Sequence, residues 1–361
     1  MRLKSLKLKN FRNCEHISME FDRDKTLIIG KNAQGKTNIL ESISFLSSLK
    51  SPRTSNIKDF VKFGAEEFKV EGILNKSDTD IELEIAYSLE KTKSIKLNGL
   101  KTTPKNYKSA FNTVLFSVQD LLLLRGSPQD RRDWLDSAIS QIYPVHDERL
   151  SKYNKIRIQK NNLLKEESLN HDLLDVFNEQ LVITGANIVF TRQKFLSEIK
   201  DYAKYVYSSI ASDETFDFEY SYPYHDSEEI ASALREELLA RKNEELARRQ
   251  ACVGPHRDDI CFSINGQDST KFASQGQQRT VVLALKLAEI ELVTKKQGSS
   301  PVLLLDDVLA ELDDIRQTYL LKSIPQQTQT IITSVDTLMF EDDFLRNVKI
   351  YNISNGSIIV N

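Results

Sequence analysis

The chain has 361 residues, which is the length of about two domains. A content of 40% hydrophobic and 28% charged residues excludes a wholly disordered chain, and no stretch holds the ~18 uninterrupted apolar residues of a membrane span. The 49 Lys and Arg residues against 52 Asp and Glu give a formal net charge of −3, so any nucleic-acid contact requires local basic clusters.

The first third predicts strands around one strand–loop–helix unit. Three segments alternate apolar and polar side chains, as strands with one solvated face do: residues 3–11, 17–21 and 66–114. Residues 26–29 form a continuous apolar run, which predicts a strand buried on both faces. Residues 36–43 follow with a helical pattern, and Asn98-Gly99 favours a hairpin turn.

The middle of the chain, from Pro128 to Arg249, has a mainly helical pattern. Leu and Ile at spacings of three and four predict an amphipathic helix over residues 171–210. The other predicted elements are helices over 145–166 and 227–249 and a loop or bent strand over Tyr220–Tyr224. We interpret residues 126–254 as a helical domain inserted into an α/β head of residues 1–125 and 255–361.

The last third returns to an α/β pattern. The predicted elements are a strand over 260–264 before the turn Asn265-Gly266, a helix over 276–295, buried strands over 302–305 and 330–333, and a closing hairpin of 349–353 and 357–360.

Residues 30–37 satisfy the P-loop pattern G-x-x-x-x-G-K-[ST], with a predicted strand before and a helix after. In such a loop the backbone amides close around phosphate oxygens, Lys36 reaches the β- and γ-phosphates, and Thr37 binds Mg²⁺. We expect Lys36 to be exposed in the empty site. The predicted nucleotide-binding residues here are Gly30, Lys31, Asn32, Ala33, Gln34, Gly35, Lys36, Thr37 and Asn38. The alternative is a plain turn between strand and helix.

The apolar run 302–305 ends in two carboxylates, Asp306 and Asp307, as a Walker B strand does. We expect Asp306 to hold Mg²⁺ and Asp307 to polarise the attacking water, so that Asp307 and Lys36 are the predicted catalytic residues. The alternative is a buried strand that ends at a surface turn.

Residues 274–279, Ser-Gln-Gly-Gln-Gln-Arg, open a predicted helix 306 − 274 = 32 residues before Asp306. A serine hydroxyl, a glycine and free amides at a positive helix end can bind an anion. Ser274, Gly276 and Gln277 are therefore predicted nucleotide contacts. Gln119, after an apolar run, is either a metal ligand or a surface glutamine.

The segment 274–279 resembles the signature motif of ABC-type ATPases, in which Ser and Gly meet the γ-phosphate of a nucleotide held by the opposite subunit. Gln275 stands where transporters have glycine. Residues 310–313, Ala-Glu-Leu-Asp, resemble the D-loop, and no histidine follows the strand 330–333, where a switch histidine often lies. SMC-type heads carry hundreds of coiled-coil residues between these motifs, whereas this chain has only a short helical arm.

Several segments resemble the RecF family of bacterial DNA repair and replication proteins. They run along nearly the whole chain: Lys9–Asn13, Gln34–Glu41, Gly126–Pro128, Val253–Asp259, Ser274–Arg279 and Leu304–Val308. Ala33 departs from the family, which usually has glycine there, and is tolerated if its φ is negative. The string Gly254–Asp259 is distinctive but has no derived role; its plain interpretation is a turn packed beside a hairpin.

The resemblance implies an α/β fold, an ABC-type ATPase head with mixed and antiparallel strands and an inserted helical arm. It implies a cytosolic protein that binds ATP and Mg²⁺, forms an ATP-dependent homodimer and binds DNA at junctions of single and double strands. RecO and RecR are the implied partners in loading RecA onto gapped DNA, with slow, DNA-stimulated hydrolysis. In SMC-like heads the N-terminal Phe-Arg-Asn corner approaches the nucleotide, which makes Arg12 a further candidate contact.

Two basic segments contain no acid, residues 1–12 and residues 91–108. Each is either a sheet edge protected by lysines or a phosphate-binding surface. Lys101, Lys105 and Lys108 are our candidate DNA contacts.

Other functions remain open. A transport ATPase subunit needs a membrane partner, and an SMC-like tether needs longer coiled coils. A P-loop kinase or GTPase needs no serine motif such as residues 274–279, which begins 274 − 36 = 238 residues after Lys36. Stimulation of ATPase activity by DNA separates these classes.

Overall fold

The computed structural model describes residues 1–361 except 91–92, 223–225, 326 and 360–361. The predictions that involve Lys91, Pro223, Tyr224 and Val360 therefore lie outside the described residues. The chain divides into a head unit, residues 1–121 and 289–361, and an arm unit, residues 122–288.

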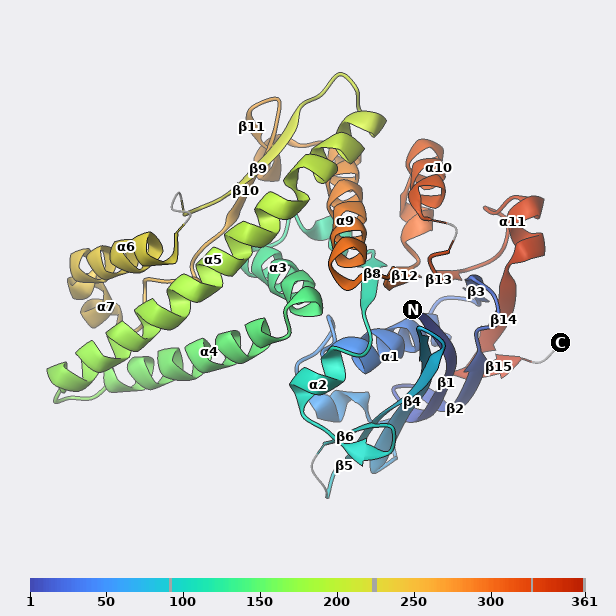
Figure 1. Ribbon diagram of the computed structural model, residues 1–361, viewed down its shortest axis with the longest axis horizontal. Coiled ribbons are helices and arrows are strands. Elements are labelled where there is room, and N and C mark those ends of the chain that lie inside the picture. Colours follow the sequence, from blue (N-terminus) through green and yellow to red (C-terminus); the bar gives the residue numbers. More distant parts are fainter. Residues whose placement is uncertain (91–92, 223–225, 326, 360–361) are drawn as a thin grey trace. The chain divides into compact units, whose positions relative to one another are not determined.

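The head unit contains two sheets and the helices around them (Figure 1). Its elements are β1 Arg2–Phe11, β2 Cys14–Glu20, β3 Lys25–Ile29, α1 Lys36–Ser48, η1 Ile57–Phe60, β4 Glu67–Lys76, β5 Thr79–Ser88, β6 Ser94–Leu97, β7 Leu100–Lys101, α2 Pro104–Lys108, β8 Thr113–Ser117, β12 Val302–Asp306, η3 Val308–Glu311, α10 Asp314–Ser323, β13 Thr330–Ser334, α11 Asp342–Asn347, β14 Lys349–Ser354 and β15 Ser357–Ile359; η2 Asp120–Leu122 lies at the boundary between the units.

The two sheets differ in strand direction. The first is antiparallel, in the order β2-β1-β4-β5-β6-β7, and the second has the order β15-β14-β3-β13-β12-β8 with parallel pairing from β14 to β8. Because parallel strands end at the same edge, the loops after β3, β12, β13 and β8 gather there. This edge carries the P-loop and the Asp306-Asp307 pair.

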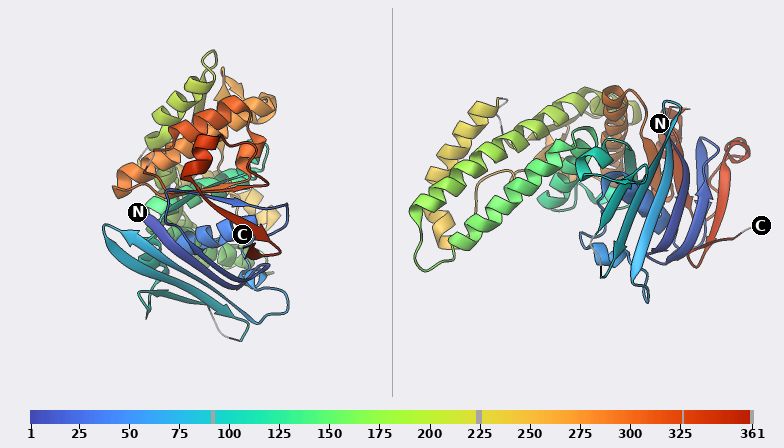
Figure 2. Two further views of the ribbon diagram at one scale, coloured as in Figure 1. Left: turned by 90° about the vertical axis from the view of Figure 1, so that its right-hand side faces the viewer. Right: turned by 60° about the horizontal axis from the view of Figure 1, so that its bottom comes forward.

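Helix α1 packs on strands of both sheets, and its apolar side chains join their common core. Figure 2 shows the long strands of the antiparallel sheet side by side. Gly72 in β4 permits the close approach of α1, because a Cβ atom there would lie 2.5 Å from Leu46 Cδ2. The last turn of α1 thus packs closely against β4.

The arm unit is mainly helical, with one small sheet. Its elements are α3 Pro128–Ile142, α4 Val145–Leu163, α5 His171–Ile210, β9 Phe216–Tyr220, α6 Ser227–Ala240, α7 Lys242–Arg248, β10 Ile260–Ile264, β11 Gln267–Asp268, α8 Ser269–Phe272 and the start of α9 Gln275–Gln297. Helices α4 and α5 lie side by side as an antiparallel hairpin (Figures 1 and 2). Among the described residues, α5 is long and apolar enough to cross a membrane by length and composition alone, as core helices of soluble proteins also are.

The arm unit extends past the predicted inserted domain, residues 126–254. It runs to Ala288 because β10 pairs antiparallel with β9, which joins residues 260–264 to the helical block. The boundaries 126 and 254 of the inserted helical domain stay a prediction.

The predicted α/β fold with a helical arm is confirmed, and α4 and α5 begin at the predicted residues 145 and 171. The single helix predicted over 227–249 is wrong in one respect, because it breaks at Arg241 into α6 and α7. Tertiary contacts accompany the break: Arg241 donates to Cys252 O, and Glu245 reaches Lys160 of α4. The helix α2 was not predicted, although Thr103-Pro104 is a helix-start signal.

Candidate nucleotide-binding site

The P-loop connects β3 to α1 and depends on its two glycines. A Cβ atom on Gly30 would lie 2.4 Å from Ile353 O, and one on Gly35 would lie 2.9 Å from Asn13 Oδ1. Gly35 also has a φ of 111°, which side-chain-bearing residues rarely adopt. The loop therefore keeps a narrow backbone path, and its amides precede a helix whose first turn carries no acid.

Lys36 is buried, with a relative exposure of 3%, so the expectation of an exposed lysine is wrong. Its Nζ donates to Gly30 O at 2.8 Å and to Lys31 O at 3.3 Å, and it lies 3.7 Å from Asp307 Oδ2. The ammonium thus folds back over the P-loop and supplies the positive charge at the place where a bound phosphate group would need it.

Ala33 has a φ of +63°, so the condition of a negative φ, under which alanine fits this position without strain, is not met. The left-handed region costs an L-residue roughly 1–2 kcal/mol relative to glycine. The loop holds this conformation although Ala33 has a Cβ atom, which identifies it as a strained position within the P-loop.

Asp306 and Thr37 meet at the end of β12. Thr37 Oγ1 donates to Asp306 Oδ1 at 3.0 Å, and Thr333 Oγ1 lies 3.0 Å from the same oxygen. Burial raises the pKa of Asp306 above its ordinary value, against the opposing effect of these two hydroxyl groups. Hydroxyl and carboxylate oxygens are the ligands that Mg²⁺ prefers, so this pair fits the ion predicted here.

Asp307 follows in the left-handed region, with a φ of 51°. Its backbone N–H donates to Thr333 Oγ1 at 2.8 Å, which fixes the direction of the residue. Its Oδ1 is buried and has no hydrogen-bond partner among the described residues. An unsatisfied carboxylate oxygen beside Lys36 is suited to accept a hydrogen bond from a water molecule.

Two of the predicted nucleotide-binding residues, Gln34 and Asn38, form hydrogen bonds that hold the P-loop in place. Gln34 Oε1 accepts from Asn355 N at 2.7 Å, and Gln34 O accepts from Gly356 N at 2.8 Å, which ties the loop to the β14–β15 turn. Asn38 donates to Asn13 Oδ1 at 2.8 Å. Lys31 and Asn32 are surface residues of the loop, so their contacts with nucleotide stay predictions.

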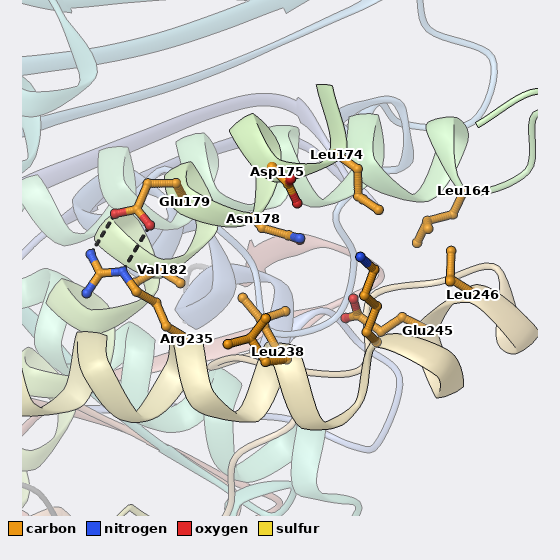
Figure 3. A pocket seen from close by; sticks show the side chains of 12 residues that line it. Leu164, Leu174, Asp175, Asn178, Glu179, Val182, Arg235, Leu238, Glu245 and Leu246 are labelled. Atoms are coloured by element: carbon orange, nitrogen blue, oxygen red, sulfur yellow. Dashed lines mark hydrogen bonds and ion pairs between the residues drawn. The ribbon is translucent and has the colours of Figure 1, made fainter. Parts of the chain in front are cut away.

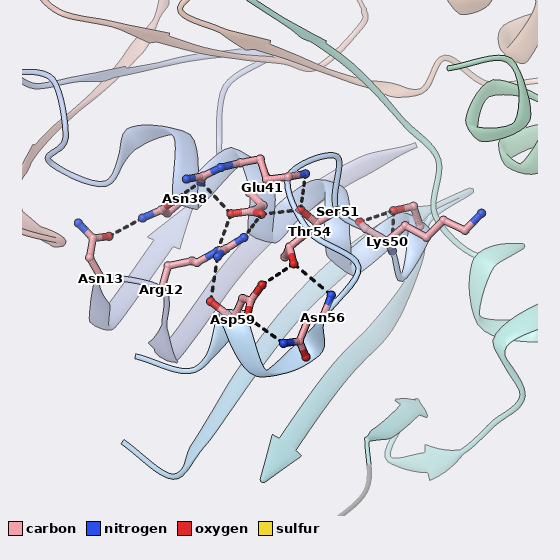
Figure 4. Close-up of polar contacts among 11 residues, drawn as sticks. Arg12, Asn13, Asn38, Glu41, Lys50, Ser51, Thr54, Asn56 and Asp59 are labelled. Atoms are coloured by element: carbon pink, nitrogen blue, oxygen red, sulfur yellow. Dashed lines mark hydrogen bonds and ion pairs between the residues drawn. The ribbon is translucent and has the colours of Figure 1, made fainter. Parts of the chain in front are cut away.

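Arg12 lies beside α1 and is held by the buried carboxylate of Glu41 (Figure 4). Its Nε and Nη2 donate to Glu41 at 3.0 and 2.6 Å, and its Nη1 donates to Asp59 O at 2.8 Å. Arg53 Nη1 lies 3.1 Å from Glu41 Oε2, the oxygen that also accepts from Arg12 Nε. An arginine with all three nitrogens engaged does not reach outward freely, and its contact with nucleotide stays a prediction.

Asn13, Glu41, Arg53 and Thr333 contact the predicted site residues but were not predicted themselves. Glu41 and Arg12 are 29 residues apart, and Thr333 and Asp306 are 27 apart. Only the pairing of strands and the packing of α1 bring them together. Arg12 was predicted from the resemblance of its Phe-Arg-Asn corner to that of SMC-like heads, whereas no signal in the sequence distinguished Glu41 from other helix residues.

Gln119 is exposed, two residues after the end of β8. Strand β8 pairs with β12 in parallel, and Ser117 lies opposite Asp306. Gln119 therefore lies at the same sheet edge as the predicted magnesium ligands. A role as a metal ligand stays a prediction.

The predicted signature residues lie in the arm unit at the start of α9. Gln277 N donates to Ser274 Oγ at 3.2 Å, and Ser274 N donates to Gln277 Oε1 at 2.8 Å, which is a reciprocal capping box. Gln277 Nε2 also donates to Glu214 Oε1 at 2.8 Å. Ser274 is exposed, and Gly276 lies in the first turn. Their contact with nucleotide stays a prediction.

The first basic segment is largely neutralised by acids from other strands. Its ion pairs are Arg2–Asp24 at 2.8 Å, Lys4–Asp80 at 2.7 Å, Lys9–Glu67 at 2.9 Å and Arg12–Glu41 at 2.6 Å. In the second segment Lys96 pairs with Glu84 at 2.7 Å, Lys101 and Lys105 are exposed, and Lys108 is half-buried in α2. The second segment is thus the more available of the two for phosphate.

A pocket of about 250 Å³ lies in the arm unit, between α5, α6 and α7 (Figure 3). Leu174, Val182 and Leu238 line it, and the ion pair of Arg235 with Glu179, at 2.6 Å, stands at its side. Its lining contains none of the predicted nucleotide-binding residues, so we do not assign the nucleotide to this pocket.

The family model described as RecF/RecN/SMC N terminal domain matches residues 2–358. The chain is 40% identical to the DNA replication and repair protein RecF of Staphylococcus haemolyticus strain JCSC1435, over 99% of this chain and 100% of that protein. It is 42% identical to the RecF of Streptococcus gordonii strain Challis, with the same shares covered. The chain belongs to the RecF family.

A solved RecF–ATP structure, of the recombination mediator in the RecFOR pathway, resembles this chain with a TM-score of 0.90 and 36% identity, over 99% of this chain and 96% of that one. An SMC head domain bound to the C-terminal winged-helix domain of ScpA resembles it with a TM-score of 0.57 and 18% identity, over 100% of this chain and 97% of that one, which shows a common fold. The RecF-family head is therefore an SMC-like, ABC-type ATPase fold, as the motifs predicted.

Proposed function

We propose that this chain binds and hydrolyses ATP in DNA replication and repair. The observation that carries the proposal is the meeting of Lys36, Thr37, Asp306 and Asp307 at one sheet edge, with contacts of 3.0 and 3.7 Å between the P-loop and the Walker B strand. The P-loop amides and Lys36 bind the β- and γ-phosphates. The RecF relative solved with ATP supports the choice of nucleotide.

Thr37 and Asp306 would hold Mg²⁺, with Gln119 as a further ligand from the adjacent strand end. The ion would supply charge neutralisation at the phosphates. Asp307 polarises the attacking water through its Oδ1, which no described residue engages in a hydrogen bond. Its left-handed backbone and its N–H bond to Thr333 keep that carboxylate in place without the switch histidine of other ABC-type ATPases.

On ATP the chain forms a homodimer in which Ser274, Gly276 and Gln277 of one copy complete the site of the other. The dimer binds DNA at junctions of single and double strands, acts in the cytoplasm with RecO and RecR to promote RecA loading, and hydrolyses ATP slowly with stimulation by DNA. Lys101, Lys105 and Lys108 contact DNA phosphates. The family membership and the names of the relatives, which refer to DNA replication and repair and to the RecFOR pathway, support the general role in DNA repair.

The test is ATP turnover with and without gapped DNA. Asp307→Asn should bind ATP and form dimers but lose turnover, because the amide cannot polarise water as a carboxylate does. Asp306→Asn should instead weaken the Mg²⁺ dependence of binding. Asp78→Asn, in the exposed turn between β4 and β5, is the matched control and should turn over normally. Wild-type turnover by Asp307→Asn, or no response of the wild type to DNA, would overturn the proposal.

A further inference from the structure

The string Gly254–Asp259 connects α7 to β10 in the arm unit, and buried bonds hold most of its members. Gly254 has a φ of 118°, and a Cβ atom there would lie 2.3 Å from Tyr153 Oη. His256 Nδ1 lies 2.7 Å from the same hydroxyl. The remaining bonds are Arg192 to Pro255 O at 2.7 Å, Tyr220 to Asp258 at 2.7 Å, and a bidentate pair of Arg131 with Asp259 at 2.6 and 2.8 Å.

Arg257 is the exception in this string, because its side chain is exposed. Its guanidinium makes one long hydrogen bond, 3.5 Å to Ala251 O, and forms no ion pair with a described residue. The bonds on either side fix the backbone at this point. The rigid loop therefore presents a single arginine to solvent.

Arg157 lies close to Arg257 on the facing helix α4. It is one helical turn beyond Tyr153 and one turn before Asn161, whose Oδ1 accepts from Ala251 N at 2.7 Å. His256 Nε2 and Arg257 both contact Ala251 O, so α4 residues 153, 157 and 161 face this loop. Arg157 Nε is buried and has no hydrogen-bond partner in the part of the chain that the structure describes.

One further arginine, Arg249, extends the cluster from the end of α7, because it lies two residues before Ala251, whose carbonyl oxygen Arg257 contacts. Arg249 is exposed and caps the helix with a φ of 53°. Arg248 pairs with Glu244 at 3.0 Å, and Glu244 is already shared with Arg241 at 2.8 Å. No carboxylate of the described residues forms an ion pair with Arg157, Arg249 or Arg257, although the charge of Arg257 contributes to lowering the pKa of Glu244. The net charge of the whole chain is −3.

Guanidinium groups without carboxylate partners suit phosphate oxygens, which they bind in a bidentate manner. We propose that Arg157, Arg249 and Arg257 form a phosphate-binding site on the arm unit, which contacts the backbone of DNA. The site rests on the proposed DNA-binding function and adds a contact surface to the lysines of the head unit. An acidic protein segment is the other class of polyanion, and the test separates the two.

The experiment measures binding of a fluorescent gapped DNA duplex to the full chain with ATP, at several salt concentrations. Each backbone contact contributes a slope of about −0.9 in log affinity against log salt. Arg257→Ala and Arg249→Ala should each lower the magnitude of this slope by about one and weaken binding roughly fivefold to tenfold at 0.1 M salt. Arg257→Lys should retain most of the slope, because it keeps the charge.

Arg235→Ala is the matched control, because this exposed arginine of the arm unit is satisfied by a bidentate pair with Glu179 at 3.0 and 2.6 Å. It should change neither slope nor affinity. Unchanged DNA binding by Arg257→Ala and Arg249→Ala would overturn the proposed site. If these substitutions instead weaken binding of poly-glutamate but not of DNA, the site binds an acidic protein segment and the proposal is also overturned. If the wild type binds no DNA, the proposed function itself fails, which is a distinguishable result.

Discussion

At the scale of single residues, two strained backbone conformations lie within the proposed nucleotide-binding site. Ala33 and Asp307 both adopt left-handed conformations, one in the P-loop and one after the Walker B strand. Such conformations cost of order 1–3 kcal/mol and persist where the surrounding structure fixes them. The loop around Ala33 is fixed by the bonds of Gln34 to the β14–β15 turn, and Asp307 by Thr333.

The strain at Ala33 gives a testable prediction. Ala33→Gly should raise the free energy of unfolding by about 0.5–1 kcal/mol, because relief of roughly 1–2 kcal/mol of strain exceeds the extra unfolded-state entropy of glycine, about 0.4–1 kcal/mol. Urea denaturation measures this difference. The control is Ala247→Gly, at an exposed site in α7, which should instead lower stability by about 1 kcal/mol. If both variants lose stability equally, Ala33 is not strained.

His256 gives a second prediction, on pH. Burial lowers the pKa of His256 to about 3, helped by the charges of Arg157, Arg257 and Arg132. Since Ala251 O only accepts, Nε2 carries the proton and Nδ1 accepts from Tyr153. A folded-state pKa below the unfolded value of 6.5 stabilises the fold fully above pH 6.5, and this stability is lost as pH falls toward 3.

Between pH 7 and pH 5 the loss from this one group is roughly 2 kcal/mol. Urea denaturation at pH 7, 6 and 5 should show a shallower pH dependence in His256→Gln than in the wild type. The glutamine side chain packs less well than the imidazole, so we expect the variant to be less stable at every pH. The test therefore compares how steeply the free energy of unfolding changes with pH in the two proteins. Parallel slopes would mean that His256 is protonated in the folded chain near pH 6.

At the scale of elements, the helices and strands that could be predicted are those set by the hydrophobic periodicity and capping residues of their own segment. The helices α4 and α5 are long and periodic, and Asn170 caps α5 by accepting from Leu173 N at 3.0 Å. The contact of Thr37 with Asp306 followed from two motifs of fixed geometry. The break at Arg241 and the burial of Lys36 depend on partners far along the chain, which no local pattern reports.

The start of α9 carries the third prediction, because Ser274 has two separable roles. Ser274→Ala removes the capping bond to Gln277 N and should lower the free energy of unfolding by about 1 kcal/mol. Ser274→Asp keeps a capping oxygen and should keep stability. If Ser274 also meets a γ-phosphate, Ser274→Asp should nevertheless lose ATP turnover, because two anions repel. Full turnover by the stable aspartate variant would leave the serine only its capping role.

At the scale of the whole molecule, the predicted site is divided between the two units. The P-loop and Walker B residues lie in the head unit, and Ser274 lies in the arm unit. The α/β head and its arm could be predicted, because the P-loop, the signature-like segment and the Walker B strand follow one another along the sequence in the order typical of ABC-type ATPases. The position of one unit relative to the other, and of one copy relative to a second, is set by long-range packing that short motifs do not encode.

The last prediction tests whether two copies share one site. Ser274→Arg places bulk and charge at the proposed contact but leaves the P-loop unchanged. It should bind ATP as a monomer, fail to dimerise and lose turnover. Lys36→Ala should fail to bind ATP, and it should also lose about 1 kcal/mol of stability, because the bonds of Lys36 to Gly30 O and Lys31 O disappear. Each variant alone should therefore be inactive.

Mixing the two inactive variants should restore turnover if the sites are composite. A mixed dimer pairs the intact Lys36 of one chain with the intact Ser274 of the other and so has one working site of two. Random pairing in equal amounts makes about half of the dimers mixed, so recovery should reach at most about a quarter of the wild-type rate. Sedimentation with ATP and turnover of the mixture are the measurements. An intact ATP-dependent dimer of Ser274→Arg with normal turnover, or no recovery in a mixture that does form dimers, would show that each chain works alone.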